Sequence, residues 1–251
     1  MSNGSLYTYI QNKIATIEFG HPASNSFPSE LLNRLTTSLN ELSTNNEVNV
    51  ILLKSEGKNT FCAGASFDEL VAISTVEEGE KFFLGFANVI NAMRKCQKLI
   101  IGRVQGKAVG GGVGLAAACD YCFATEQASI KLSEFTIGIG PFVIAPAVTR
   151  KMGLAALSEL TLDAVNWQNA YWAKEKGLYA KVFGSINEMD KEVDNFVFKL
   201  SQYNLEALRE MKKVLWKGTE NWDLLLEERA KISGKLVLSE TTKSALQKFK
   251  K

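Results

Sequence analysis

The chain has 251 residues, of which 46% are hydrophobic and 22% charged, a length that suffices for a full hydrophobic core in one globular unit. Lys and Arg total 29 against 27 Asp and Glu, and the net charge of +2 gives no field that would gather nucleic acid or an anionic membrane. We therefore expect neither as a partner, and a cytoplasmic location because the four cysteines accompany no secretory signal at the N-terminus.

The first half of the chain alternates strand and helix patterns. Period-2 or continuous apolar runs predict strands, and leucines at helical spacing predict helices. The elements expected are strands over 6–10 and 14–19 joined by a polar turn at Gln11 and Asn12, a helix over 28–42, a strand over 48–54, a helix over 77–96 and a strand over 99–104. Such repetition indicates an α/β fold.

The second half starts with short elements and ends in helices. The expected strands lie over 121–124, 129–132 and 180–183, and the expected helices over 114–118, 143–152, 154–162, 187–203, 204–217 and 219–236, with a helical tail over 239–250. We divide the chain into a core over 1–185 and a C-terminal helical region over 186–251, within a single unit.

Two motifs suggest chemistry that the rest of the chain does not support. Cys119 and Cys122 form a C-x-x-C, but no second pair and no downstream histidine completes a zinc site, so we expect no metal. His21, the sole histidine, lies in a loop beside Pro22 without a nucleophile motif such as G-x-S-x-G. A His-dependent nucleophile is therefore disfavoured.

The glycine cluster at 110–112 does not fit the phosphate-binding loops. Residues 102–108 lack the spacing and the hydroxyl of a Walker loop, and the third glycine of a dinucleotide fingerprint would fall on Leu115. Two interpretations remain. The glycines allow close packing of a helix against a strand, or they present backbone N–H groups to a cavity at the start of a helix.

A second loop of small residues, Phe61–Ala65, follows the strand over 48–54 and precedes a helix that we expect to begin near Phe67. Two N–H donors from separate loops are what a thioester oxygen needs when it becomes an enolate oxygen. Loss of one such donor costs about 3–4 kcal/mol of transition-state stabilisation. The two loops together predict an enolate-stabilising pocket.

With these two loops, the sequence resembles the enoyl-CoA hydratase/isomerase (crotonase) superfamily. The matching segments, in the family's order, are His21–Ser26, Phe61–Ala65, Gly106–Gly112, Ala118–Asp120, Ser133–Gly138 and Ala170–Val182. The resemblance implies a spiral of β-β-α turns and a C-terminal helical region that forms homotrimers or hexamers built as dimers of trimers. It also implies a coenzyme A thioester as substrate, with no cofactor.

The resemblance assigns roles to individual residues. The family's oxyanion donors fall on the backbone N–H groups of Ala65 and Gly111. Its substrate contacts fall on Ala23, Ser24, Ala63, Gly64, Phe67 and Gly110, with Leu70 and Phe142 as candidate walls of the acyl pocket. Plain core packing is the competing explanation for these last two apolar side chains.

The acid/base positions distinguish this chain from the hydratases of the family. Hydratases carry two glutamates, and the position of the first is Gly114 here, whereas the second is retained as Glu134. Enoyl-CoA isomerases resemble this chain in keeping only the second. We therefore expect Glu134 to act as general base and then general acid in moving a double bond from 3-enoyl to 2-enoyl, with a raised pKa.

Three alternatives stay open. Asp68 or Glu69 could replace the missing glutamate in a hydratase, although acids in a first helical turn are ordinarily solvated. The chain could also be a non-catalytic protein that binds CoA, with Glu134 a solvated loop carboxylate. A lysine within 245–250 could contact a CoA phosphate, although a solvated charged tail is the explanation that we favour for this segment.

Overall fold

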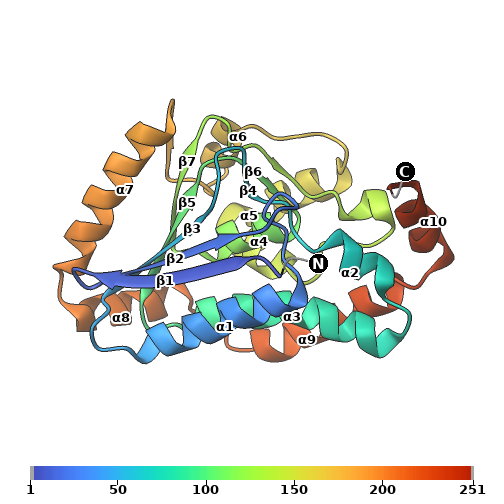
Figure 1. The fold of residues 1–251 in the computed structure, drawn as a ribbon, viewed down its shortest axis with the longest axis horizontal. Coiled ribbons are helices and arrows are strands. Elements are labelled where there is room, and N and C mark those ends of the chain that lie inside the picture. Colours follow the sequence, from blue (N-terminus) through green and yellow to red (C-terminus); the bar gives the residue numbers. More distant parts are fainter. Residues whose placement is uncertain (1–2, 250–251) are drawn as a thin grey trace.

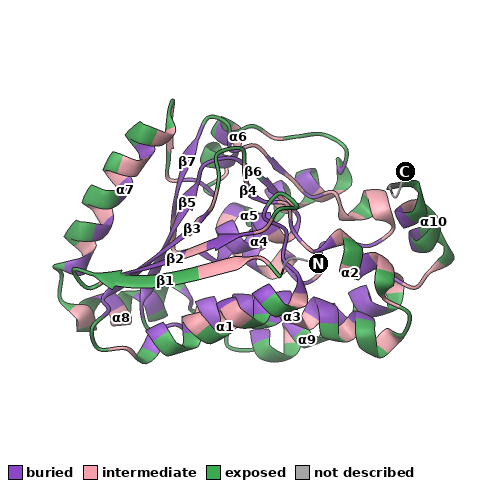
Figure 2. Ribbon diagram, viewed as in Figure 1, coloured by how far each residue is buried: buried purple, intermediate pink, exposed green. Residues whose placement is uncertain are grey.

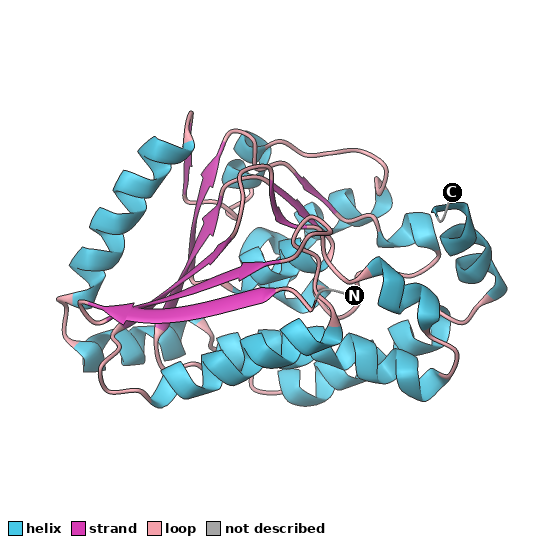
Figure 3. Ribbon diagram, viewed as in Figure 1, coloured by secondary structure: helices cyan, strands magenta, loops and turns pink. Residues whose placement is uncertain are grey.

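The computed structural model describes residues 3–249, which form two β-sheets covered by helices (Figures 1 and 3). The strands are β1 (Ser5–Gln11), β2 (Ile14–Gly20), β3 (Val50–Ser55), β4 (Thr60–Cys62), β5 (Leu99–Val104), β6 (Lys107–Val109), β7 (Tyr121–Thr125), β8 (Ile130–Lys131) and β9 (Lys181–Phe183). The larger sheet has the order β1-β2-β3-β5-β7-β9 and the smaller sheet the order β4-β6-β8. β1 pairs antiparallel with β2, and the other pairings between these strands are parallel.

The helices surround the sheets on several sides (Figure 1). They are α1 (Ser29–Thr44), α2 (Phe67–Ala72), α3 (Val76–Lys95), α4 (Gly111–Ala118), the 3-10 helix η1 (Glu134–Ile137), α5 (Ala145–Leu162), α6 (Ala170–Glu175), α7 (Ile186–Ser201), α8 (Leu205–Leu215), α9 (Trp222–Leu236) and α10 (Glu240–Phe249). α1, α3 and α9 pack side by side, while α7 lies against β2, β3, β7 and β9. None of the described helices combines the length and the apolar character that crossing a bilayer requires.

The α/β class predicted from the sequence is confirmed, and the differences are local. The three-residue strands β4 and β6 and the helix α6 escaped prediction because segments this short show no periodicity. The two helices expected over 143–152 and 154–162 are confirmed, because the helical backbone of α5 is interrupted at Gly153, where φ is +83° and ψ is +162°. The hairpin turn is centred on Asn12 and Lys13, both with positive φ, one residue later than expected.

The inner strands of the large sheet are buried on both faces. All six residues of β5 and five of the six in β3 are buried, whereas β1 is exposed along most of its length (Figure 2). Parallel strands covered on both faces are typically continuous apolar runs, which is the pattern seen over 99–104. The carboxyl ends of the small sheet's strands, β4, β6 and β8, lead into the loops of the candidate site.

α9 packs against α3 with unusually close backbones. A Cβ atom on Gly79 of α3 would lie 2.7 Å from the carbonyl oxygen of Gly234 in α9, and a Cβ on Gly234 would lie 2.6 Å from the amide nitrogen of Glu80. Only glycine fits such an approach. The contact brings the C-terminal helices onto the core and places Ser233 at the wall of the cavity described below.

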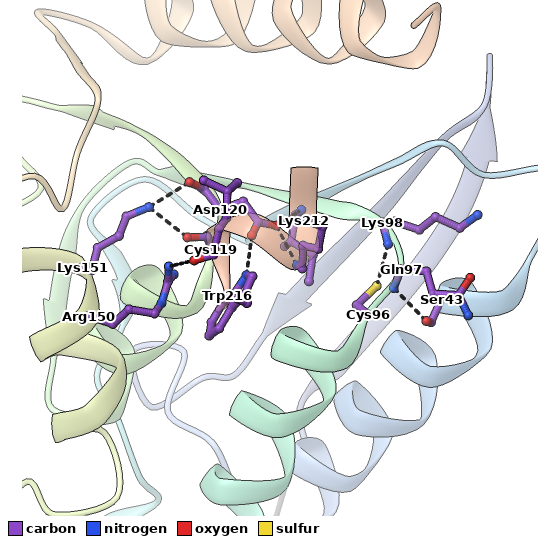
Figure 4. Close-up of polar contacts among 12 residues, drawn as sticks. Ser43, Cys96, Gln97, Lys98, Cys119, Asp120, Arg150, Lys151, Lys212 and Trp216 are labelled. Atoms are coloured by element: carbon purple, nitrogen blue, oxygen red, sulfur yellow. Dashed lines mark hydrogen bonds and ion pairs between the residues drawn. The ribbon is translucent and has the colours of Figure 1, made fainter. Parts of the chain in front are cut away.

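Asp120, at the end of α4, joins the C-terminal helices to the large sheet (Figure 4). Its Oδ2 accepts hydrogen bonds from the backbone N–H of Ile100 and from Lys212 Nζ, each at 2.7 Å, and its Oδ1 accepts one from Trp216 Nε1 at 2.7 Å. The Arg150 guanidinium lies 3.7 Å from the centroid of the Trp216 ring. Both oxygens of this buried carboxylate therefore have partners, as burial of a charge requires.

Candidate functional site

A cavity of about 800 Å³ opens where the loops after β4, β6 and β8 meet α2 and α3. All eleven residues expected at the site from the sequence line it: Ala23, Ser24, Ala63, Gly64, Ala65, Phe67, Leu70, Gly110, Gly111, Glu134 and Phe142. They come from five separate stretches of the chain. Most of the cavity wall is apolar, so polar groups that face it are poorly solvated.

The loop after β4 is fixed by backbone hydrogen bonds to the segment that precedes α1. Phe27 N–H donates to Gly64 O at 2.8 Å, Ser66 N–H donates to Phe27 O at 3.0 Å, and Ala63 N–H donates to Ser24 O at 3.1 Å. Gly64 has a φ of +88°, a conformation that favours glycine. Between these anchored residues, the N–H of Ala65 has no hydrogen-bond acceptor within residues 3–249.

The glycine cluster opens α4 on the opposite side. Gly110 has a φ of +52° and donates its N–H to Lys131 O at 2.9 Å. A Cβ on Gly111 would lie 2.3 Å from the Phe86 ring, and one on Gly112 would lie 2.3 Å from Cys62 O. Close packing, one of the two interpretations of the cluster, therefore holds for these two glycines. The N–H of Gly111, at the first residue of α4, has no acceptor in the described part of the chain.

The two loops touch at the cavity. A Cβ on Gly64 would lie 2.9 Å from Val109 O and 3.3 Å from the Gly111 nitrogen. The free N–H groups of Ala65 and Gly111 therefore come from adjoining backbone segments that line one space. Paired backbone donors fixed before the reaction can stabilise a developing oxyanion without reorganisation.

Glu134, the first residue of η1, places its carboxylate over the start of α4. A Cβ on Gly110 would lie 2.7 Å from Glu134 Oε1, so the carboxylate lies directly against this glycine. Oε2 is buried and has no hydrogen-bond partner within residues 3–249. Burial away from water raises the pKa of this carboxyl to about 7, against a small lowering by its own backbone N–H.

The space beside Gly114, the position of the absent first glutamate, is filled by the side chain of Ile144. A Cβ on Gly114 would lie 2.4 Å from Cγ2 and 2.7 Å from Cβ of Ile144, which itself lines the cavity. An apolar side chain therefore occupies the space into which a carboxylate at residue 114 would project. The sequence shows the glycine but gives no sign of the isoleucine 30 residues later.

Of the two acids considered as replacements, Asp68 lines the cavity and Glu69 does not. Glu69 Oε2 accepts hydrogen bonds from the backbone N–H and the hydroxyl of Ser29, at 2.9 and 2.6 Å, at the start of α1. A carboxylate is favoured at a helix N-terminus because unpaired N–H groups gather there. The suggestion that Glu69 supplies a second acid is therefore wrong.

His21 lies in the expected loop, and it also contributes to the cavity wall. Its Nδ1 accepts a hydrogen bond from Ala23 N–H at 3.1 Å and lies 3.2 Å from the Ser26 hydroxyl. The ring thus helps to fix the loop that carries the expected substrate contacts Ala23 and Ser24.

The thiols of Cys119 and Cys122 are buried, and each donates to a backbone carbonyl of α4. Within residues 3–249, no group of three or more His, Cys, Asp or Glu side chains is arranged to hold a metal ion.

At the C-terminus, α10 packs against η1. Lys248 of α10 does not line the cavity, and Lys250 lies outside the described residues.

Several residues of the cavity wall were not indicated by any motif. They are Phe83 and Phe86 of α3, Ser233 of α9, Ile144, Lys131, Val165 and Trp167. Helical periodicity marks the first three only as buried positions, and the last three belong to strand and loop segments without a signature. These side chains reach the cavity only because segments that are distant in the chain pack together.

Comparison with known proteins finds enoyl-CoA hydratases and isomerases among the proteins that are similar to this chain. The enoyl-CoA hydratase/isomerase family model matches residues 9–250. A peroxisomal Delta(3,5)-Delta(2,4)-dienoyl-CoA isomerase of Arabidopsis thaliana is 30% identical over 198 residues, which cover 73% of this chain and 69% of the relative. A short-chain-enoyl-CoA hydratase of Clostridium acetobutylicum is 28% identical over 244 residues, covering 95% of this chain and 92% of the relative. The structure of an enoyl-CoA hydratase from Bacillus halodurans superposes with a TM-score of 0.89 at 21% identity, covering 97% of this chain and 99% of that one.

Proposed function

Because the chain belongs to the enoyl-CoA hydratase/isomerase family, we propose that it shifts the double bond of a 3-enoyl-CoA thioester to the 2-position. One observation supports isomerisation over hydration. Glu134 presents a buried carboxylate oxygen without a partner, while Ile144 fills the space of a second glutamate. A 1,3-proton shift needs one base that also returns the proton, whereas hydration ordinarily uses a second group to handle water.

In the proposed complex the thioester oxygen accepts hydrogen bonds from the N–H groups of Ala65 and Gly111. The CoA portion lies along Ala23, Ser24, Ala63, Gly64, Phe67 and Gly110, which line the cavity on that side. The acyl chain extends along the apolar wall, where Leu70 and Phe142 are joined by Phe83 and Phe86. No cofactor is required, because the thioester itself makes the C2 proton acidic.

The reaction follows from this arrangement. Ionised Glu134 takes a proton from C2, and the electron pair of the C–H bond delocalises over C2, C4 and the thioester oxygen as a dienolate. The two N–H donors stabilise the negative charge on oxygen. Glu134, now protonated, gives the proton to C4, the double bond forms between C2 and C3, and the carboxylate is regenerated. A carboxyl with a pKa of about 7 suits both transfers near neutral pH.

Hydration of a 2-enoyl-CoA is the second candidate, because Asp68 also lines the cavity. In that reaction Glu134 and Asp68 would divide the tasks of activating water and protonating C2. Asp68 lies in the first turn of α2, where a carboxylate is stabilised by the helix N-terminus, so we rank this function second.

We further propose that the protein assembles as a homotrimer or as a dimer of trimers. Large apolar side chains are exposed on several helices, and a monomer would leave them in water. They include Leu154 and Leu162 on α5, Met211 and Val214 on α8, and Leu224 on α9. The four cysteines are all free and buried, which supports a reducing compartment such as the cytoplasm.

The function is tested by supplying 3-hexenoyl-CoA and trans-2-hexenoyl-CoA separately to the purified protein. Isomerisation predicts that the absorbance of the conjugated thioester rises with the first substrate and that no hydroxyacyl product forms from the second. Loss of conjugation with the second substrate and no reaction with the first would establish hydration instead. Binding of CoA thioesters without turnover of either would contradict both functions.

A further inference from the structure

Lys131, at one rim of the cavity, and Lys107, which does not line the cavity, both contact the indole ring of Trp167. Lys107 of β6 and Lys131 of β8 have their Nζ atoms 5.1 and 5.6 Å from the centroid of the Trp167 ring. The β6–β8 register pairs Val109 with Lys131, and Lys107 lies two residues before Val109, so alternation along the strands places these side chains on one face of the small sheet. Lys131, Val109 and Trp167 all line the cavity.

This positive charge is not neutralised by the protein. Neither lysine forms an ion pair with a carboxylate within residues 3–249. Lys131 Nζ donates one hydrogen bond, to Val165 O at 2.7 Å, which leaves two of its three donor hydrogens available. Lys107 is exposed and Lys131 is half-buried, so both ammonium groups can be reached by an anionic ligand.

Lys131 is also tied directly to the proposed reaction site. Its carbonyl oxygen accepts the hydrogen bond from Gly110 N–H, and the chain continues over three residues to Glu134. The backbone of Lys131 is therefore held next to the proposed oxyanion donors and base. A ligand that occupies the cavity would therefore lie beside Lys131 and Trp167.

We propose that Lys131, supported by Trp167 and Lys107, binds an anionic group of the substrate. The proposal rests on the proposed function in that it takes a thioester as the occupant of the cavity. The anion is a phosphate of CoA or a carboxylate on the acyl chain, both of which offer oxygen acceptors to an ammonium. The indole face holds the two lysine side chains in place through cation–π contact.

The chain contains a matched pair outside the cavity. Lys176 Nζ lies 5.8 Å from the centroid of the Trp172 ring, in the same kind of contact, but it forms an ion pair with Glu175 at 3.3 Å. Neither Lys176 nor Trp172 lines the cavity. Replacing Lys176 by Met therefore removes a lysine–indole contact without touching the proposed anion site.

Calorimetric titration of the wild type, Lys131→Met and Lys176→Met tests the proposal. The probes for phosphate are acetyl-CoA and S-acetylpantetheine, which share the acyl group and differ in the phosphates and the adenosine of CoA. The probes for a carboxylate are S-glutarylpantetheine and S-pentanoylpantetheine. We expect Lys131→Met to weaken binding of the anionic member of one pair about tenfold, with its neutral member unchanged, and Lys176→Met to bind like the wild type. The pair affected identifies the source of the anion.

Equal affinities of the wild type and Lys131→Met for all four probes would overturn the inference. An equal loss for anionic and neutral probes would also overturn it, because it would reduce Lys131 to a support for the 163–168 loop. Binding is measured without turnover, so the two proposals can fail separately. A wild type that binds acetyl-CoA but does not move a double bond contradicts the proposed function alone, whereas a wild type that binds none of the probes contradicts both.

Discussion

Two buried carboxylates in this protein stand in opposite situations. Asp120 has a side chain only 3% exposed, and its two oxygens accept three hydrogen bonds, one of them from the buried ammonium of Lys212 (Figure 4). Glu134 has a buried oxygen with no hydrogen-bond partner within residues 3–249 and faces a cavity. A paired buried charge holds segments together, and an unpaired one is destabilising unless a ligand or a proton compensates it. The contrast assigns Asp120 to stability and supports the proposal that Glu134 takes part in the reaction.

The largest effect is expected from Glu134→Gln. The amide has nearly the shape of the carboxyl but cannot accept a proton, so turnover of 3-hexenoyl-CoA should fall by about 10²–10⁴-fold. The free energy of unfolding should stay the same or rise, because the variant no longer buries an ionisable group. Steady-state kinetics and urea denaturation measure the two quantities. Unchanged turnover with reduced stability would reverse the roles given to the two carboxylates.

Asp120→Asn should produce the opposite pattern. The amide leaves the Lys212 ammonium buried without its counter-charge, and such a change costs about 3–5 kcal/mol of unfolding free energy. Turnover per folded molecule should stay close to that of the wild type, because Asp120 does not line the cavity. Denaturation curves monitored by tryptophan fluorescence report the loss. A variant as stable as the wild type would contradict the structural role of this ion pair.

A smaller effect is expected at Gly114, the position of the absent first glutamate. Gly114→Ala introduces a Cβ that would lie 2.4 Å from Ile144 Cγ2, and overpacking of this kind costs about 1–3 kcal/mol of stability. Adding Ile144→Ala to the same chain should restore part of that loss, since it removes Cγ2. If Gly114→Ala is as stable as the wild type, Ile144 does not fill the space of a second acid, and the preference for isomerisation over hydration weakens.

The sequence predicted the main elements of the fold because buried parallel strands and amphipathic helices carry strong periodicity. The run over 99–104 became β5 without a change of boundary. Of the small sheet, only β8 was predicted, as a strand over 129–132, because β4 and β6 have three residues each and show no periodicity. The existence of this sheet depends on pairing between segments that lie far apart in the chain, which periodicity within one segment does not report.

The candidate site was predictable where the backbone carries the role. Gly64 and Gly110 have positive φ, and Gly111 and Gly112 have neighbours that exclude a Cβ, so these positions restrict the residue type and leave a pattern in the sequence. The side chains that complete the wall leave no such pattern. Ile144 and Lys131 fit the cavity through packing, and the exclusion of Glu69 depends on a contact with Ser29, 40 residues away.

The pH dependence of kcat/KM for 3-hexenoyl-CoA tests the assignment of Glu134 most directly. Burial raises the pKa of this carboxyl to about 7, and only its ionised form can take the C2 proton. We therefore predict that kcat/KM rises about tenfold per pH unit below 7 and levels off above it, and that this rise is absent from the residual activity of Glu134→Gln. A profile that levels off already near pH 4.5, the ordinary value for a solvated glutamate, or the same profile in both proteins, would contradict Glu134 as the base.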